Sequence, residues 1–181
     1  MRPAAVLIGV PGSGKTTVGA LLAEHLGVAF RDTDHDIAAL CGTPVPDFVR
    51  RHGEARFRAL EREAVRAALD EHDGVLALGG GAVLDEATQR RLAGHRVVHL
   101  KVGLSTALAR IGSAQDRPLL AGDVESRLGE LFRVRGPVYR RLARLEFDTD
   151  TDTNTNADTD ADAGSADGTA QRLAHALGAV A

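Results

Sequence analysis

Apolar and polar positions along the chain form blocks that predict strands and helices in alternation. Short apolar runs, typical of buried parallel strands, occupy residues 4–8, 28–30, 75–78, 96–102 and 145–147. Helical spacing follows each run, over 16–26, 35–40, 44–51, 53–71, 85–92, 105–110, 124–143 and 169–177. Ser105 is expected to cap the helix that starts there, and Gly136-Pro137 to break the helix over 124–143. The alternation predicts an α/β fold, with a five-stranded parallel sheet between helices on both faces.

The first strand–helix junction carries a phosphate-binding motif. Residues 9–16 read Gly-Val-Pro-Gly-Ser-Gly-Lys-Thr and fit G-x-x-x-x-G-K-[ST] without a mismatch. Glycines let the backbone turn tightly around an anion, and the amides at the helix start then point at phosphate oxygens. Lys15 would reach the outer phosphates, and the Thr16 hydroxyl would ligate Mg²⁺. We expect the nucleotide to be held by Gly12, Ser13, Gly14, Lys15, Thr16 and Thr17.

Two carboxylates follow the second predicted strand. Asp32 and Asp34 are two residues apart, so in extended backbone both side chains would project along one side. At the carboxyl end of a strand, Asp32 would hold Mg²⁺ through water, because this ion keeps most of its hydration shell. Asp34 would then accept hydrogen bonds from a substrate hydroxyl. The alternative is that the Asp-Thr-Asp turn only caps the next helix.

Two further segments indicate a substrate site. Gly79, Gly80 and Gly81 follow the third predicted strand, where bare backbone would let a polyol lie close to the chain; the alternative is a tight turn. Residues 112–122 are polar and bounded by glycines, which makes them the best lid candidate. This segment contains Arg117, which would swing in to neutralise charge on a transferring phosphoryl group, or else stay exposed to water.

Composition bounds the size of the protein and the ligands it suits. The chain has 181 residues, enough for one domain, and 44% of them are apolar, with five Phe, one Tyr and no Trp. Residues 148–170 hold seven Asp and no Lys or Arg; without them, 22 basic residues face 18 acidic ones, a net charge of +4. A mildly basic body suits an anionic ligand in a cleft better than a nucleic-acid surface.

Cysteine content and the apolar runs indicate the compartment. The single cysteine, Cys41, allows no internal disulfide and fits a reducing cytosol. The N-terminal apolar run leads straight into the phosphate loop, so it is interpreted as a strand rather than a signal peptide. No stretch approaches the ~18 apolar residues of a membrane span. We therefore expect a cytoplasmic monomer that binds neither membrane nor nucleic acid.

Taken together, these motifs and two more resemble the shikimate kinase family. In chain order the matching segments are the phosphate loop, Asp32-Thr33-Asp34, Gly53 to Glu61, Leu78 to Ala82, Arg117 to Leu120 and Arg135 to Tyr139. The match runs from residue 4 to about residue 150. The resemblance implies a P-loop NTPase fold of the nucleoside-monophosphate-kinase-like type. It would be a single kinase domain over 1–181 with three α/β/α layers, a substrate-binding subdomain over 33–61 and a lid over 112–123.

The resemblance also implies an activity and its residues. The γ-phosphate of ATP would pass, with Mg²⁺, to the 3-hydroxyl of shikimate, giving shikimate 3-phosphate and ADP in the pathway to chorismate and the aromatic amino acids. Catalysis would depend on Lys15, Asp34 and Arg117, and metal binding on Thr16 and Asp32. Arg110 would stack on adenine, and Arg117 would close over the phosphate. Shikimate would contact Asp34, Arg58, Gly79, Gly80, Gly81 and Arg135, the two arginines clamping its carboxylate.

Residues 149–168 depart from the family pattern. There the corresponding loop is short and supplies a basic residue against adenine, whereas this chain has no Lys or Arg between Arg144 and Arg172. Composition predicts a disordered, low-complexity acidic loop, because it lacks apolar residues to bury. Ca²⁺ binding is an alternative, but Thr153 and Thr159 stand where an EF-hand loop needs Gly and Glu.

Two other functions compete with the one that the resemblance implies. A gluconate-type small-molecule kinase would share the phosphate loop, but would not need two arginines for a ring carboxylate. A non-catalytic nucleotide-binding module is suggested by the acidic insert, although Lys15, Asp32, Asp34 and Arg117 argue against it.

Overall fold

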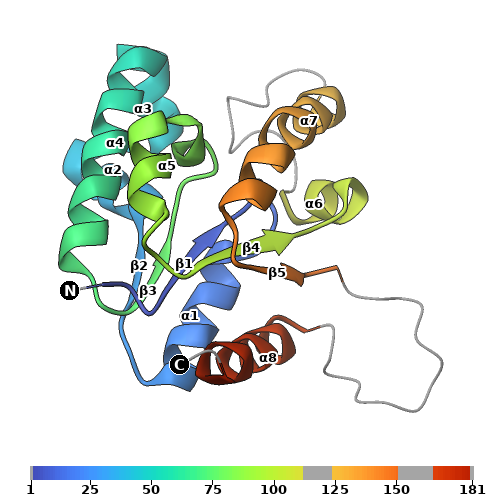
Figure 1. Ribbon diagram of the computed structural model, residues 1–181. Coiled ribbons are helices and arrows are strands. Elements are labelled where there is room, and N and C mark those ends of the chain that lie inside the picture. The colour runs from blue at the N-terminus through green and yellow to red at the C-terminus, as the bar shows by residue number, and fades with distance from the viewer. Residues whose placement is uncertain (1, 112–123, 151–164, 180–181) are drawn as a thin grey trace.

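The computed structural model describes residues 2–111, 124–150 and 165–179, and within these ranges five strands form one parallel sheet (Figure 1). The strand order is β2-β3-β1-β4-β5, so the strand that leads into the phosphate loop lies at the centre. The strands are β1 (Ala5–Ile8), β2 (Phe30–Asp32), β3 (Val75–Ala77), β4 (Val97–Lys101) and β5 (Leu145–Asp148). The predicted α/β class with a five-stranded parallel sheet is confirmed.

Helices cover both faces of this sheet (Figure 1). Along β1, Ala5 and Leu7 pack with α1 and α8, whereas Val6 and Ile8 pack on the face covered by α4, α5 and α7. This alternation follows from the two-residue period of a strand buried on both sides. The helices are α1 (Lys15–Leu26), α2 (Thr33–Cys41), α3 (Val45–His52), α4 (Glu54–Glu71), α5 (Glu86–Leu92), α6 (Leu104–Ile111), α7 (Val124–Leu142) and α8 (Ala166–Ala179), with a short 3₁₀ turn η1 (Ala82–Leu84).

Helices α2, α3 and the start of α4 share a small core of their own. Ile37, Phe48, Phe57 and Ala64 form this cluster, and half-buried Cys41 packs against it. None of the described helices is both long and apolar enough to cross a bilayer.

Three local expectations are wrong. The strand over 28–30 lies two residues later, at Phe30–Asp32, because Val28 is exposed at the turn after α1. Ser105 is the second residue of α6 rather than its cap. Helix α7 continues through Pro137, although proline removes one backbone hydrogen bond. The fully buried side chains of Leu128 and Tyr139 anchor α7 on either side of that point.

Candidate active site

The phosphate loop joins the central strand β1 to α1 and leaves the start of that helix uncapped. Gly14, the residue before α1, has a left-handed backbone with φ of 83°, and no side chain caps the helix. Gly12 also has a positive φ of 81°, and an added Cβ would lie 2.8 Å from the Ala107 carbonyl oxygen. Only glycine fits both constraints at position 12. The uncapped amides and the positive end of the helix dipole therefore form an anion-binding site.

Lys15 lies over this loop, and its ammonium is held by the loop itself. Nζ donates to the carbonyl oxygens of Gly9 at 2.9 Å and Val10 at 3.1 Å, and reaches Ser13 Oγ at 3.5 Å. The charge thus lies beside the uncapped helix start, where the sequence motif predicts it.

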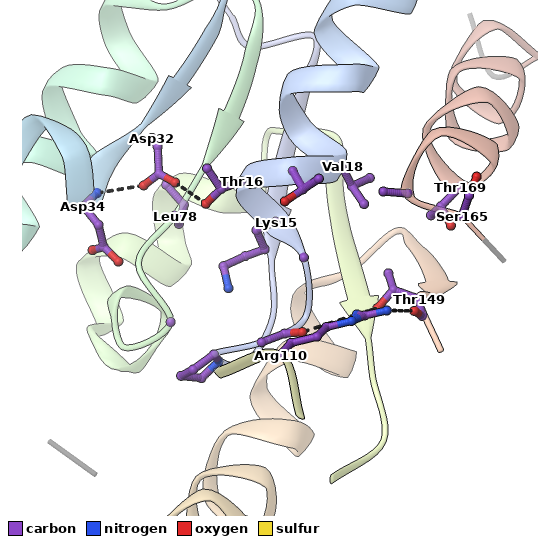
Figure 2. A pocket seen from close by; sticks show the side chains of 16 residues that line it. Lys15, Thr16, Val18, Asp32, Asp34, Leu78, Arg110, Thr149, Ser165 and Thr169 are labelled. Carbon is purple, nitrogen blue, oxygen red and sulfur yellow. Dashed lines mark hydrogen bonds between the residues drawn. The ribbon is translucent and has the colours of Figure 1, made fainter. Parts of the chain in front are cut away.

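Asp32 connects the phosphate loop to α2. Its Oδ2 accepts a hydrogen bond from the Thr16 hydroxyl at 2.8 Å, and its Oδ1 accepts one from the Asp34 amide at 2.9 Å (Figure 2). Asp32 is buried, whereas Asp34 is exposed in the first turn of α2. The expectation that both project from extended backbone is therefore wrong. Asp32 does cap α2, as the alternative proposed, and its second oxygen still contacts Thr16.

One cavity of about 550 Å³ runs along these groups (Figure 2). Its wall includes most of the residues expected to hold nucleotide and metal, together with two of the expected substrate residues. These predicted residues are Gly12, Gly14, Lys15, Thr16, Thr17, Asp32, Asp34, Gly80 and Arg110. Ser13 does not line the cavity, because its side chain is completely buried under the loop.

The glycine segment after β3 brings the remaining substrate candidates together. An added Cβ at Gly79 would lie 2.4 Å from Asp34 Oδ1, and one at Gly81 would lie 2.3 Å from Arg58 Nη1. At Gly80 the nearest atom would be Arg135 Nη1, at 3.3 Å. Side chains from α2, α4 and α7 thus approach the backbone here so closely that a Cβ at position 79 or 81 would displace one of them. Arg58 and Arg135 lie around the end of the cavity rather than in its wall.

Glu61 also lies in this cluster, and it is not among the site residues expected from the sequence. It is 3% exposed, and its Oε2 accepts a 2.6 Å hydrogen bond from Arg58 Nη1. Burial raises the pKa of Glu61, the Arg58 charge opposes that rise, and the charge of nearby Asp34 adds to it. Glu61 lies one helical turn after Arg58, but this spacing alone does not show that the carboxylate is buried.

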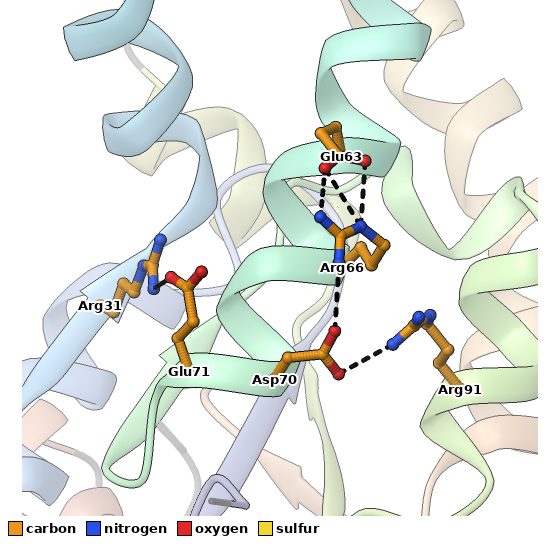
Figure 3. A network of polar contacts seen from close by, with 6 residues as sticks. All are labelled: Arg31, Glu63, Arg66, Asp70, Glu71 and Arg91. Atoms are coloured by element: carbon orange, nitrogen blue, oxygen red, sulfur yellow. Dashed lines mark hydrogen bonds and ion pairs between the residues drawn. The ribbon is translucent and has the colours of Figure 1, made fainter.

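Arg66 of α4 belongs to a network of charged side chains on the surface. Arg66 pairs with Glu63 and Asp70, and Asp70 also binds Arg91 of α5 (Figure 3). Exposed pairs of this kind contribute little to stability. Arg58 differs from Arg66 because its main partner, Glu61, is buried.

The opposite end of the cavity is formed by Arg110 and Thr149. Arg110 Nη1 donates to Thr149 Oγ1 at 3.1 Å and to the Gly12 carbonyl oxygen at 3.3 Å, and Nη2 donates to the Thr149 carbonyl oxygen. Thr149, Ser165 and Thr169 line this end but were not predicted. Thr149 directly follows β5, and the carboxyl edge of a parallel sheet is where ligands bind, so its position was the signal.

Part of the predicted machinery lies outside the described residues. This applies to Arg117 and the lid over 112–123, and to residues 151–164 of the acidic segment. Of that segment, Thr149 is buried beside β5, and α8 already begins at Ala166.

The sequence as a whole matches known proteins. Residues 11–164 match a family model described as shikimate kinase. A shikimate kinase of Frankia casuarinae is 57% identical over 144 residues, which are 80% of this chain and 64% of that relative. One of Thermobifida fusca is 54% identical over 148 residues, or 82% of this chain and 86% of the relative. This chain belongs to the shikimate kinase family.

Solved shikimate kinases share the fold as well. The enzyme of Acinetobacter baumannii in complex with shikimate has a TM-score of 0.85 at 31% identity, covering 99% of this chain and 94% of that one. The enzyme of Bacteroides thetaiotaomicron has a TM-score of 0.79 at 28% identity, covering 98% of both chains. The resemblance read from the motifs is confirmed.

Proposed function

We propose that this chain transfers the γ-phosphate of ATP to the 3-hydroxyl of shikimate, giving shikimate 3-phosphate and ADP. Family membership supports ATP as donor, and the similar Acinetobacter enzyme was solved with shikimate. One observation carries the proposal. A single cavity has Lys15 and the uncapped start of α1 on its wall, and it reaches Asp34 and Gly80 at the cluster that contains two arginines.

The phosphate end would bind the nucleotide through backbone amides and Lys15. The loop amides would cradle the phosphates, and the ammonium would reach the outer ones. Arg110, fixed by Thr149, would lie against adenine at the far end. Together these contacts would orient the γ-phosphate toward the glycine segment, and for a loose transition state orientation is the larger part of catalysis.

Thr16 and Asp32 have the chemistry of an Mg²⁺ site. A hydroxyl and a carboxylate oxygen, 2.8 Å apart on the cavity wall, suit a hard cation. Among the described residues no cluster of three or more His, Cys, Asp or Glu could hold a metal by itself. This fits Mg²⁺, which is usually held by few protein groups together with phosphates and water. When bound, it would neutralise charge on the outer phosphates.

The glycine cluster would bind shikimate. Arg58 and Arg135 approach the same three-residue backbone from two helices, so they would grip one carboxylate from two sides. Asp34, exposed and next to Gly79, would hold the hydroxyls and accept the proton of the attacking one. The small core of α2, α3 and α4 supports the proposal that residues 33–61 act as a substrate-binding subdomain.

We place Arg117 over the transferring phosphate, with residues 112–123 as the lid. A guanidinium that arrives with the lid would neutralise charge as it develops and would exclude water. We propose that the chain acts as a monomer. We also propose a cytoplasmic location, from the single Cys41.

An assay that couples ADP release to absorbance tests the function. We expect turnover with MgATP and shikimate, and none with gluconate or a nucleoside monophosphate. Turnover of gluconate alone would contradict the proposal and favour the gluconate-type kinase, and in that case Arg58→Ala would leave activity intact. Binding of ATP and shikimate by calorimetry without ADP release would instead show a non-catalytic nucleotide-binding module.

A further inference from the structure

Tyr139 is completely buried behind the glycine cluster, and its hydroxyl reaches the backbone there. It lies on α7, and its hydroxyl donates a 2.6 Å hydrogen bond to the Gly80 carbonyl oxygen. Its ring stacks on His99 of β4, with centroids 5.1 Å apart and planes at 29°. His99 Nδ1 in turn lies 2.8 Å from Glu146 Oε1 on β5. The aromatic ring is thus fixed against the sheet, and its polar end faces the proposed substrate site.

Arg135 lies one helical turn before Tyr139 on α7, on the same side of the helix. Burial raises the pKa of Tyr139 to about 12, although the nearby charge of Arg135 opposes this rise. The hydroxyl therefore keeps its proton at any physiological pH. Arg135 also lies close to Gly80, since its Nη1 is 3.3 Å from the Cβ position of that glycine.

The direction of the hydrogen bond to Gly80 is fixed, because a carbonyl oxygen can only accept. The hydroxyl therefore donates to Gly80, which ties a side chain of α7 to the backbone after β3. Within the described part of the chain the buried Nε of Arg135, beside the same glycine, has no hydrogen-bond partner.

We propose that Tyr139 is a positioning residue for shikimate, whose hydroxyl fixes the Gly80 peptide beside the Arg135 guanidinium. This inference rests on the proposed function, in which both groups contact the substrate. Gly80 lines the cavity, so a displaced peptide there would shift the substrate relative to the arginine that binds its carboxylate. Tyr139 would hold that peptide without touching the substrate, and the phosphate end of the cavity would not depend on it.

The competing explanation is that Tyr139 only fills the core. In that case the loss of its hydroxyl would affect stability, and any effect on activity would be shared by both substrates. Tyr139→Phe separates the two explanations, because it keeps the ring and the stacking on His99. It removes the hydrogen-bond donor from the Gly80 carbonyl oxygen.

The experiment measures kcat and both KM values for the wild type and Tyr139→Phe, with Leu128→Val as the matched control. Leu128 is a fully buried residue of the same helix and the same core cluster, so its truncation loosens α7 without removing a polar group. Thermal melting of all three proteins reports stability. Calorimetric titration with shikimate reports binding even where turnover is slow.

We expect Tyr139→Phe to raise the KM and the Kd for shikimate about tenfold, the size of one hydrogen bond lost from a buried partner. The KM for ATP should stay within about twofold, and Leu128→Val should lower the melting temperature with both KM values unchanged. A shikimate KM within twofold of the wild type would overturn the inference, as would equal changes in both KM values. Absence of shikimate turnover by the wild type would overturn the proposed function instead.

Discussion

The Thr16 hydroxyl donates a hydrogen bond to Asp32 Oδ2 over 2.8 Å, joining the first turn of α1 to the end of β2. The other oxygen of the same carboxylate caps α2 through the Asp34 amide. One side chain therefore links the proposed metal site to the helix that presents the proposed proton acceptor. Its charge and its capping role can be separated experimentally, because asparagine caps helices as well as aspartate does.

Asp32→Asn should weaken Mg²⁺ binding with little loss of stability. The variant keeps an oxygen for the Asp34 amide but removes the negative charge beside Thr16. A group that holds a metal through water typically contributes 10–100-fold to its affinity. We expect the Mg²⁺ concentration for half-maximal activity to rise by about that factor, measured at saturating ATP and shikimate.

Asp85→Asn is the matched control, because Asp85 caps α5 through the Thr88 amide in the same way and lies at another part of the fold. Its Mg²⁺ dependence should equal that of the wild type. Equal Mg²⁺ dependence in the Asp32 variant would show that this carboxylate serves the helix alone.

Gly81→Ala should damage shikimate binding while the fold persists. Its methyl group would lie 2.3 Å from Arg58 Nη1, the mobile end of a long side chain, so Arg58 would move and the backbone would not. A displacement of that size in a binding group lowers kcat/KM by about 10–100-fold. Steady-state kinetics with shikimate varied would measure it. Gly94→Ala, with no atom within 4 Å of its added Cβ, should have the same kinetics as the wild type. Normal kinetics in both variants would show that Arg58 does not bind the substrate.

Thr149→Val should affect ATP and spare shikimate. The hydroxyl accepts from Arg110 Nη1 and bonds to the carbonyl oxygens of Ser13 and Lys101, so valine would remove one of the hydrogen bonds that hold Arg110 at the proposed adenine end. Loss of one such hydrogen bond corresponds to about 1 kcal/mol, or about a fivefold rise in the KM for ATP. Thr149→Ser keeps the hydroxyl and should restore it. If both variants showed the same KM, the hydroxyl would have no part in nucleotide binding.

His99 should make the protein less stable in mild acid. Burial lowers its pKa below the ordinary value of 6.5, and the hydrogen bond and charge of Glu146 oppose this only in part. The unfolded chain then binds the proton first, so stability is complete above about pH 6.5 and falls as the pH drops toward the lowered pKa. Melting temperatures from pH 7.5 to 5.5 should decline less steeply in His99→Gln than in the wild type. His175→Gln, at an exposed position of α8, should decline like the wild type; parallel curves for all three would exclude His99 as the cause.

The order of strands and helices could be predicted because the strands are buried on both faces. Val6 and Val98, for example, are fully buried; β1 has no polar residue, and β4 has only His99 before its end at Lys101. The ends of elements were harder, since β2 is an edge strand and Phe30 and Arg31 are only half-buried there. Pro137 within α7 was misjudged because packing at Leu128 and Tyr139 outweighs a local preference.

The candidate site was predictable where a motif determines it and not where tertiary contacts do. Lys15 and Thr16 belong to a motif whose geometry is local, and the structure places both on the cavity wall. Tyr139 and Thr149 reach the site through contacts with Gly80 and Arg110, which lie 59 and 39 residues away along the chain. Glu61 is a helical neighbour of Arg58, but its burial depends on tertiary packing. Sequence spacing encodes neither the distant contacts nor the burial.

The Lys15 ammonium, held at 2.9 Å and 3.1 Å by two carbonyl oxygens of its own loop, has a consequence for the energetics of nucleotide binding. A lysine side chain carries about 2 kcal/mol of rotamer entropy when it is free. Folding has already removed much of that freedom here, so an incoming phosphate exchanges partners with an ordered cation instead of immobilising a mobile one. The conformational cost of that contact is thus largely borne when the chain folds, so the new attraction is offset mainly by the two carbonyl contacts that the phosphate replaces.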